Sequence, residues 1–360
     1  MSSIWGKRLK ISIFGESHGP SIGVVLDGFP AGVAIDEQFI MTQMKRRAPG
    51  GESFSTKRNE DDIPQIQSGV FNGFSTGTPI CAIIQNSEAH SNDYADLENK
   101  PRPGHADFTG KIRYDGFNDY RGGGHFSGRL TAPLVFAGAL CKLALLGKGV
   151  KIGAHILQIG NIKDDAFEDV DSKVLDSKVL DSLSLSRFAV INPAKGEKML
   201  ELIKETAEKT DSIGGVVQCA AIGLDAGIGS PIFDTIEGNI ASIIFGIPAV
   251  KGVEFGAGFG VAAMNGSQNN DSFKFEDGKV VTKTNNAGGV LGGISSGMPI
   301  IFNVAFKPTP SIYLSQDTVD LVAREGTEIA IKGRHDACIV PRAVPVVEAG
   351  CAVALLDLLL

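Results

Sequence analysis

The sequence predicts an α+β fold in which antiparallel sheets cover a central layer of helices. Segments with strand and helix patterns are mixed along the chain without a regular βαβ alternation, and strands often follow one another directly, which favours antiparallel pairing. Residues 344–358 are apolar on nearly all sides, as expected of a helix buried in the interior. No Pro/Gly/Ser-rich linker divides the 360 residues, so we expect one domain spanning 1–360.

Apolar periodicity predicts the elements of the first half of the chain. Strands are expected at 9–13, at 23–26 and within 69–85, and helices at 36–47 and 130–146. Asp36 is a suitable N-cap for the first helix, and Pro49 followed by Gly50 ends it. Residues 87–127 are polar and rich in glycine and predict little regular structure. A compact domain that carries so long a loop usually has a use for it.

The second half continues this mixture of elements. Helices are expected at 194–209, 236–244, 318–331 and 344–358, strands at 213–224 and 298–306, and a glycine-punctuated hairpin at 250–263. The local repeat within DSKVLDSKVLDSLSLS, at 171–186, is far too short for a solenoid, and we expect a surface elaboration there. Residues 265–297 form a second long polar and glycine-rich region.

Composition narrows the classes of function. The net charge of −7 and the pI near 5.5 disfavour binding to nucleic acid, whereas a small anionic ligand needs only a local arginine cluster. The five cysteines form no C-x-x-C pair, which argues against a disulfide framework or a zinc site and suits a reducing compartment. Neither a signal peptide nor a convincing membrane segment is recognised. We therefore expect a cytoplasmic protein with no membrane or nucleic-acid partner and no metal.

Two histidines lie in loops dense with polar and glycine residues: His18 in GESHG and His105 in RPGHAD. Histidine suits proton transfer near neutral pH, although either loop alone is more often a hydrogen-bonded turn. Arginines recur beside glycine, where a guanidinium can capture phosphate or carboxylate. The triple glycine at 122–124, followed by Ser127 and a helix, is similar to an anion cradle. No P-loop, dinucleotide fingerprint or G-x-S-x-G elbow is present. The residues thus indicate an anion-binding enzyme with histidine acid–base chemistry.

Read together, these segments resemble the chorismate synthase family over essentially the whole chain, in the family's order. The matching motifs are FGESHG (14–19), RRAPG (46–50), RPGHADFTGKIRYD (102–115), DYRGGG (119–124), AVKGVEFG (249–256), NNAGGVLGGISSG (285–297), KPTPSI (307–312) and GRHDACIVPRAVPVVEA (333–349). The resemblance implies a β-α-β sandwich assembled as a homotetramer.

The resemblance also implies an activity. Members of the family are lyases that convert 5-enolpyruvylshikimate 3-phosphate to chorismate by anti-1,4-elimination of phosphate, the last common step of the shikimate pathway in aromatic amino-acid biosynthesis. They need reduced FMN, although the reaction has no net redox change. The reducing equivalents come either from NADPH used by the protein itself or from an external flavin reductase.

Roles for individual residues follow from the same resemblance. It implies that His18 protonates the departing phosphate, that His105 holds or protonates the reduced flavin near its N1–C2 edge, and that Asp336 helps the flavin N5 accept the proton from C6 of the substrate. The implied substrate-binding residues are Ser17, Arg47, Ser127, Arg129 and Arg334. The implied cofactor-binding residues are His125, Phe126, Ser127, Pro248, Ala249, Gly292, Lys307, Pro308, Thr309, Pro310, Ser311 and Arg334.

The sequence departs from the family mainly in one motif. It reads GGGHFSGRLT where members usually read GGGRSSARET, so that His125 stands in place of an arginine and Phe126 in place of a serine, and Gly128 and Leu130 are also substituted. Outside this motif, Ala337 replaces the usual proline after Asp336, and Ser53 stands where many members carry another basic residue. His125 is a weaker anion contact at neutral pH, and Phe126 offers a ring for stacking. Two other hypotheses remain beside the lyase: an FMN oxidoreductase in which the flavin itself turns over, and a non-catalytic anion-binding protein.

Overall fold

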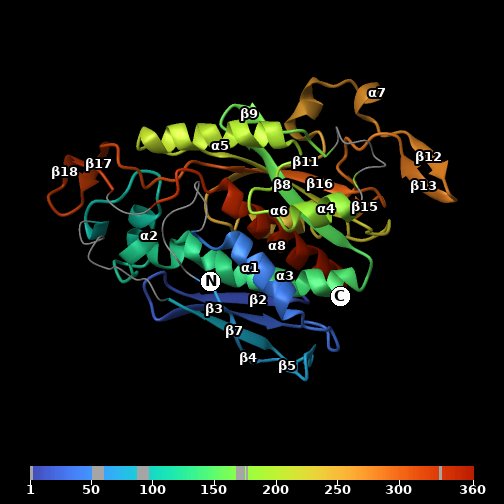
Figure 1. Ribbon diagram of the computed structural model, residues 1–360, viewed down its shortest axis with the longest axis horizontal. Helices are drawn as coiled ribbons and strands as arrows, with labels where there is room; N and C mark the ends of the chain where they lie inside the picture. The colour runs from blue at the N-terminus through green and yellow to red at the C-terminus, as the bar shows by residue number, and fades with distance from the viewer. Residues whose placement is uncertain (1–2, 51–60, 87–96, 168–174, 176, 332–334) are drawn as a thin grey trace.

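The structure is a computed structural model that describes residues 3–50, 61–86, 97–167, 175, 177–331 and 335–360. Within this part, two five-stranded antiparallel sheets lie on opposite sides of a layer of helices (Figure 1). One sheet has the strand order β1 (Ile4–Trp5), β2 (Lys10–Gly15), β3 (Ser21–Asp27), β7 (Ile80–Gln85), β4 (Gln65–Ser68). The other has the order β11 (Val250–Phe255), β16 (Ile300–Phe306), β10 (Gly215–Ile222), β8 (Lys151–Ile159), β9 (Ile162–Lys163). The predicted α+β class, with helices between antiparallel sheets, is therefore confirmed.

Short hairpins and helices complete the fold. The hairpins are β5 (Val70–Phe71) with β6 (Phe74–Ser75), β12 (Phe273–Glu276) with β13 (Lys279–Thr282), β14 (Val290–Leu291) with β15 (Ile294–Ser295), and β17 (Gln316–Asp320) with β18 (Glu325–Ile329). The middle layer contains α1 (Glu37–Arg47), α3 (Thr131–Leu146), α6 (Ile236–Ile244) and α8 (Val340–Leu359). The remaining helices are α2 (Asp107–Arg113), α4 (Ser177–Leu183), α5 (Pro193–Glu208) and α7 (Gly266–Asn269), and short 3-10 turns span Arg121–Phe126, Gly128–Leu130 and Gly258–Ala263.

The long C-terminal helix α8 is the centre of the molecule. It packs against α1, α3 and α6 and also contacts β8 and β10 (Figure 1). Its residues are buried almost throughout, as the sequence predicted. A Cβ on Gly138 of α3 would collide with Ala349, so the glycine lets the two helices touch closely. By length and composition alone, 121–146 is apolar enough to cross a membrane, but 83% of its most apolar part is buried inside the fold.

The middle layer also buries a cluster of charges around Glu348 of α8. Its carboxylate accepts hydrogen bonds from Arg46 in α1, with Nη1 at 2.7 Å and Nη2 at 2.9 Å, and from Lys142 in α3. It also accepts one from the backbone N–H of Ala154 in β8, at 3.0 Å. Burial alone would raise the pKa of Glu348, but Arg46 and Lys142 outweigh it and lower the pKa to about 2. One carboxylate therefore joins three helices to the second sheet.

Most of the predicted elements are confirmed, including the α1 helix that Asp36 caps through the N–H of Phe39. The predicted helix at 318–331 is wrong. This stretch contributes to the β17–β18 hairpin, whose strands are rich in β-branched residues. The carboxylate of Asp320 accepts hydrogen bonds from the N–H groups of Val322 and Ala323, which forms the turn in the middle of the expected helix.

Two further expectations need correction. Residues 250–263 are not a hairpin, because β11 pairs with the distant strand β16 and is followed by a 3-10 turn. The repeat at 171–186 is more than a surface elaboration. Residues 171–174 and 176 lie outside the described residues, but α4 buries Leu180 and Leu183, and Leu180 packs on Gly153 of β8. The apolar residues of the repeat thus add to the core.

Replacing Glu348 with glutamine should strongly destabilise the protein. The change keeps the shape of the side chain but leaves the buried Arg46 and Lys142 without their counter-charge, and breaking such a cluster costs about 3–5 kcal/mol. Urea unfolding of wild type and Glu348→Gln measures this loss. The matched control is Asp181→Asn, which removes an exposed pair with Lys151 and should cost less than about 1 kcal/mol. Equal losses for the two variants would contradict the structural role of Glu348.

The same comparison should depend on pH. Because the pKa of Glu348 falls from 4.5 to about 2 on folding, its charge stabilises the native state above pH 4.5. That contribution is lost as the pH falls from 4.5 towards 2. The gap in unfolding free energy between wild type and Glu348→Gln should therefore shrink across this window, and a constant gap would be inconsistent with a buried ion cluster.

Candidate functional site

A cavity of about 570 Å³ lies where several helices begin or end. Its lining comes from the end of α1, the loop before α2, the segment 122–131 that leads into α3, the segment 245–250 after α6, the segment 306–311 after β16, and the start of α8 with the residues before it. The volume is that of a site for a small molecule. Segments far apart in the sequence therefore meet at one concave surface.

Positive charge dominates the lining. The cationic side chains are Arg47, Arg102, Arg129, Lys307 and Arg342. Carboxylates that contact them within the described part of the chain are Asp62, Asp107 and Asp336. Cations thus outnumber these carboxylates by two, and the side chains of Arg47, Arg102 and Arg129 are buried. An anionic ligand would offset the cost of burying this charge.

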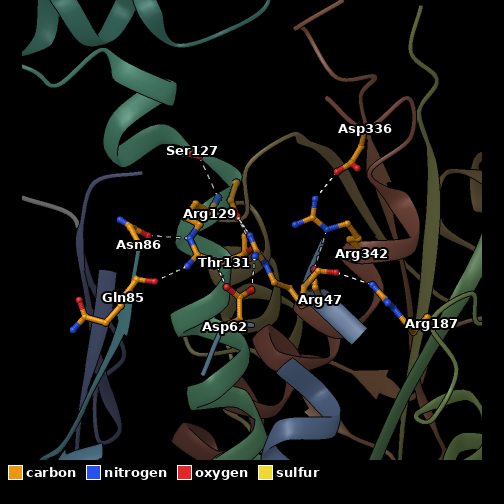
Figure 2. A network of polar contacts seen from close by, with 12 residues as sticks. Arg47, Asp62, Gln85, Asn86, Ser127, Arg129, Thr131, Arg187, Asp336 and Arg342 are labelled. Atoms are coloured by element: carbon orange, nitrogen blue, oxygen red, sulfur yellow. Dashed lines mark hydrogen bonds and ion pairs between the residues drawn. The ribbon is translucent and has the colours of Figure 1, made fainter. Parts of the chain in front are cut away.

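Arg47 and Arg129 share one buried carboxylate, that of Asp62 (Figure 2). Arg47 donates to Asp62 from Nη1 (2.9 Å) and to the carbonyl of Gly128 from Nη2 (2.7 Å). Arg129 donates to Asp62 from Nη1 and to Asn86 from Nε (3.1 Å). Burial would raise the pKa of Asp62, but the two arginines lower it below its ordinary value. Asp62 does not line the cavity, so it holds both guanidinium groups from behind.

A second pair lies across the cavity. Arg342 of α8 donates a hydrogen bond to Asp336 through Nη1 and another to the backbone carbonyl of Arg47 through Nε, at 2.9 Å (Figure 2). Arg187 donates to the neighbouring carbonyl of Ala48 at 2.8 Å. The end of α1 is therefore fixed to the loop that carries Asp336.

The RPGHAD loop forms a compact group of three charged or titratable side chains. Asp107 accepts hydrogen bonds from Arg102, through Nε at 2.7 Å and Nη2 at 2.8 Å, and contacts Nδ1 of His105 at 2.6 Å. Arg102 and His105 line the cavity, whereas Asp107 lies behind them. This arrangement repeats that of Asp62, with a carboxylate buried behind the groups that face a ligand.

The triple glycine brings both predicted acid–base loops to this site. All three glycines have positive φ values, of 58°, 85° and 52°. A Cβ on Gly122 would lie 2.5 Å from Cδ2 of His18 and 2.7 Å from Oγ of Ser17, and a Cβ on Gly123 would lie 3.0 Å from Cε1 of His105. Only glycine allows this approach. The two histidine loops thus pack against opposite parts of one glycine turn.

Two residues that depart from the family pattern, His125 and Phe126, contact other parts of the protein. Nδ1 of His125 donates to the carbonyl of Gly15 at 2.8 Å, and Nε2 lies 3.1 Å from Oγ of Ser3. Phe126 packs on Gly110 and lies 6.2 Å from Tyr114 between ring centroids. Both also line the cavity. They attach the glycine turn to β2 and α2. Both residues therefore have a structural role in addition to any contact with a ligand.

The segments after α6 and β16 form another wall. Its polar groups include the Thr309 hydroxyl, which is buried and has no hydrogen-bond partner in the described part of the chain. The Ser311 hydroxyl accepts a hydrogen bond from Arg102 at 3.1 Å. Lys307 donates to the carbonyl of Gly104, and its pKa is lowered by burial and by nearby Lys251. A lysine in this setting gains from an anion beside it.

The cavity brings together most of the residues predicted for the site. Those that line it are Arg47, His105, His125, Phe126, Ser127, Arg129, Pro248, Ala249, Lys307, Thr309, Pro310, Ser311 and Asp336. Ser17 and His18 lie behind Gly122. Gly292, at the β14–β15 turn, and Pro308 are not in the lining. Arg334 lies outside the described residues.

Sequence reasoning missed several residues of the site. Asp62, Asp107 and Arg342 were not predicted as site residues, although the last two stand inside recognised motifs. A carboxylate two positions after His105 is a local signal that could have identified Asp107. Asp62 offers no such signal, because its partners are 15 and 67 residues away.

Comparison with known proteins gives a consistent result. A family model described as chorismate synthase matches residues 9–360. The chain is 48% identical over 360 residues to the chorismate synthase of Dehalococcoides mccartyi strain BAV1, covering 100% of this chain and 97% of the relative. It is 47% identical over 357 residues to that of Thermococcus kodakarensis, covering 99% and 97%. A solved structure described as a crystal structure of chorismate synthase is similar with a TM-score of 0.75 at 31% identity, covering 99% of this chain and 92% of that chain.

Replacing Gly122 with alanine should disturb the site beyond the ordinary cost of a side chain at positive φ. That backbone cost is about 1–2 kcal/mol. The new methyl group must in addition displace His18 and Ser17. The matched control is Gly116→Ala, at φ 80° with no atom within 4 Å of the added Cβ. Urea unfolding should show a larger loss for Gly122→Ala than for Gly116→Ala, and equal losses would argue against tight packing at the glycine turn.

Proposed function

The chain belongs to the chorismate synthase family, and from this premise we propose that it is a lyase that converts 5-enolpyruvylshikimate 3-phosphate to chorismate and phosphate. In this anti-1,4-elimination the substrate loses a proton from C6 and its phosphate group from C3. The observation that carries the proposal is the convergence of six separate motifs on one strongly cationic cavity. The substrate carries a phosphate and two carboxylates, which require such a site.

In this proposal the substrate anions bind to the arginines of the cavity. Arg47 and Arg129 are oriented by Asp62, so little side-chain freedom is lost when an anion arrives. The Ser127 hydroxyl accepts the N–H of Arg129 at 3.2 Å and still has its own proton to donate. Arg334 and Ser17 complete the proposed substrate contacts.

The cavity also fits FMN. Its apolar lining residues, which include Ile247, Val250 and Ile339, suit a planar ring. Among the described residues the buried Thr309 hydroxyl has no hydrogen-bond partner, and a ligand would supply one. We propose that the cofactor is held by His125, Phe126, Ser127, Pro248, Ala249, Gly292, Lys307, Pro308, Thr309, Pro310, Ser311 and Arg334. When bound, reduced FMN supplies electron density for cleavage of the C–O bond without net redox change.

Proton transfer falls to three side chains in this proposal. His18 donates a proton to the leaving phosphate, since a dianion leaves more readily when protonated. His105 holds a proton at the N1 edge of the cofactor. Asp336, oriented by Arg342, takes part in moving the proton that leaves C6. The His18 ring packs against Gly122, which lines the cavity. His105 and Asp336 line the cavity directly.

The proposed enzyme is cytoplasmic and homotetrameric, with one domain spanning 1–360. One continuous hydrophobic cluster draws on both sheets and the middle layer, which supports a single domain. Reduction of FMN comes either from NADPH at this protein or from a separate flavin reductase.

An anaerobic assay tests the proposed reaction. The protein is mixed with reduced FMN and 5-enolpyruvylshikimate 3-phosphate, and chorismate and free phosphate are followed together. We expect equal amounts of the two products and no net consumption of reduced FMN. Oxidation of NADPH by protein and FMN without chorismate would instead favour an FMN oxidoreductase, and binding without any turnover would favour a non-catalytic protein.

The acid–base roles predict that His18→Ala and His105→Ala each lower kcat by about 100- to 10,000-fold. FMN binding, measured by flavin fluorescence, should persist in both variants because other side chains line the cofactor wall. His155→Gln is not a suitable control, since this buried histidine bonds to Asp164 and Gln218 in the core. Lys151→Gln, at an exposed pair, should retain wild-type turnover. Near-normal rates for both histidine variants would refute the assignment.

A further inference from the structure

The carboxylate of Asp107 is surrounded by donors. Oδ2 accepts the backbone N–H and the Nε–H of Arg102, at 3.0 and 2.7 Å. Oδ1 accepts from Nη2 of Arg102 at 2.8 Å and lies 2.6 Å from Nδ1 of His105. Its side chain is only 4% exposed and does not line the cavity. Any effect of Asp107 on a ligand must therefore act through Arg102 or His105.

These contacts determine where the protons are. Burial would raise the pKa of Asp107, but hydrogen bonds from Arg102 and His105 outweigh it and hold the pKa far below its ordinary value. An ionised carboxylate can only accept hydrogen bonds, and a guanidinium can only donate. The contact between Asp107 and Nδ1 therefore requires a proton on Nδ1 of His105. Nε2 is then the ring nitrogen that can exchange a proton with a ligand.

Neighbouring groups hold the imidazole ring in this orientation. Nη2 of Arg102 lies 3.1 Å from Nδ1 and 3.3 Å from Nε2 of the ring, and Gly123 leaves no room for a side chain beside Cε1 and Nε2. Arg102 is itself fixed to the cofactor wall through Ser311. A rotation of the ring would break the hydrogen bond to Asp107 and bring the ring into collision with Arg102 or Gly123.

We propose that Asp107 is a positioning residue: it holds His105 with Nδ1–H turned into the protein, so that Nε2 is the ring nitrogen left to exchange a proton with a ligand. The inference rests on the proposed function for the role of His105, but the ring orientation can be tested without any ligand. Without Asp107 the two neutral tautomers of His105 compete, and the proton is no longer confined to the inner nitrogen.

The experiment uses full-length protein labelled with ¹⁵N-histidine. The chain has six histidines, so the ring signals of His105 can be assigned by their loss in His105→Ala. We expect Nδ1 of His105 to be protonated in the wild type at neutral pH. A bare Nδ1 in the wild type would overturn the proposal, and this measurement needs no Asp107 variant to fold.

The variant Asp107→Asn extends the test to catalysis. We expect the proton to be distributed over both ring nitrogens of His105, kcat to fall at least about tenfold, and KM to change less. The matched control is Asp119→Asn. Asp119 accepts the N–H, Nε–H and Nη2–H of Arg121 in the same way, and the histidine near its charge is His18 rather than His105. The control should leave the His105 ring signals in place.

The possible results distinguish a failure of the positioning role of Asp107 from a failure of the proposed function. An unchanged ring signal and unchanged kcat in Asp107→Asn would overturn the positioning role. If Asp119→Asn alters the His105 signals as much as Asp107→Asn does, the effect is a general response to losing an Asp–Arg pair, and the proposal fails. If the wild type makes no chorismate, the proposed function fails, whereas the nitrogen spectrum still decides the orientation of His105.

Discussion

The cavity depends on the buried carboxylate of Glu348. Removing two cations and one anion from water is costly, and the cluster is tolerated only because each charged group is hydrogen-bonded. The same contacts join α1, α3 and α8, which are the helices whose ends line the cavity. Arg46 and Arg47 are neighbours in the sequence, yet one points to Glu348 in the core and the other to the site. Core and site are thus built from the same turn of α1.

A second regularity is that acidic side chains orient the basic groups of the site. Asp62 lies behind Arg47 and Arg129, and Asp107 lies behind Arg102 and His105. The oxygens of each carboxylate accept hydrogen bonds from the side chains that it orients. These side chains therefore lose less conformational entropy when a ligand binds, and the direction of each donor is fixed. A cavity with more cations than carboxylates, whose cations are held in place, is therefore suited to anions.

Sequence reasoning could identify the fold class, most elements and the motifs that converge on the cavity, because periodicity and glycine-rich loops are local signals. It failed where the important contacts join residues that are far apart in the sequence. Asp62 meets Arg129 only after folding, and the strand pairing of β11 with β16 cannot be read from residues 250–263. At 318–331 the turn at Asp320 replaced a helix that apolar spacing favoured. The placement of Leu180 in the core likewise depends on Gly153 of a distant strand.

We propose that one cavity receives the substrate anions and FMN together. A crystal structure of the protein with FMN and 5-enolpyruvylshikimate 3-phosphate would show both ligands. We expect substrate phosphate or carboxylate oxygens within hydrogen-bond distance of Arg47 and Arg129, and a flavin ring between residues 245–250 and 307–311. A flavin or a substrate bound elsewhere on the protein, with this cavity filled only by solvent, would contradict it.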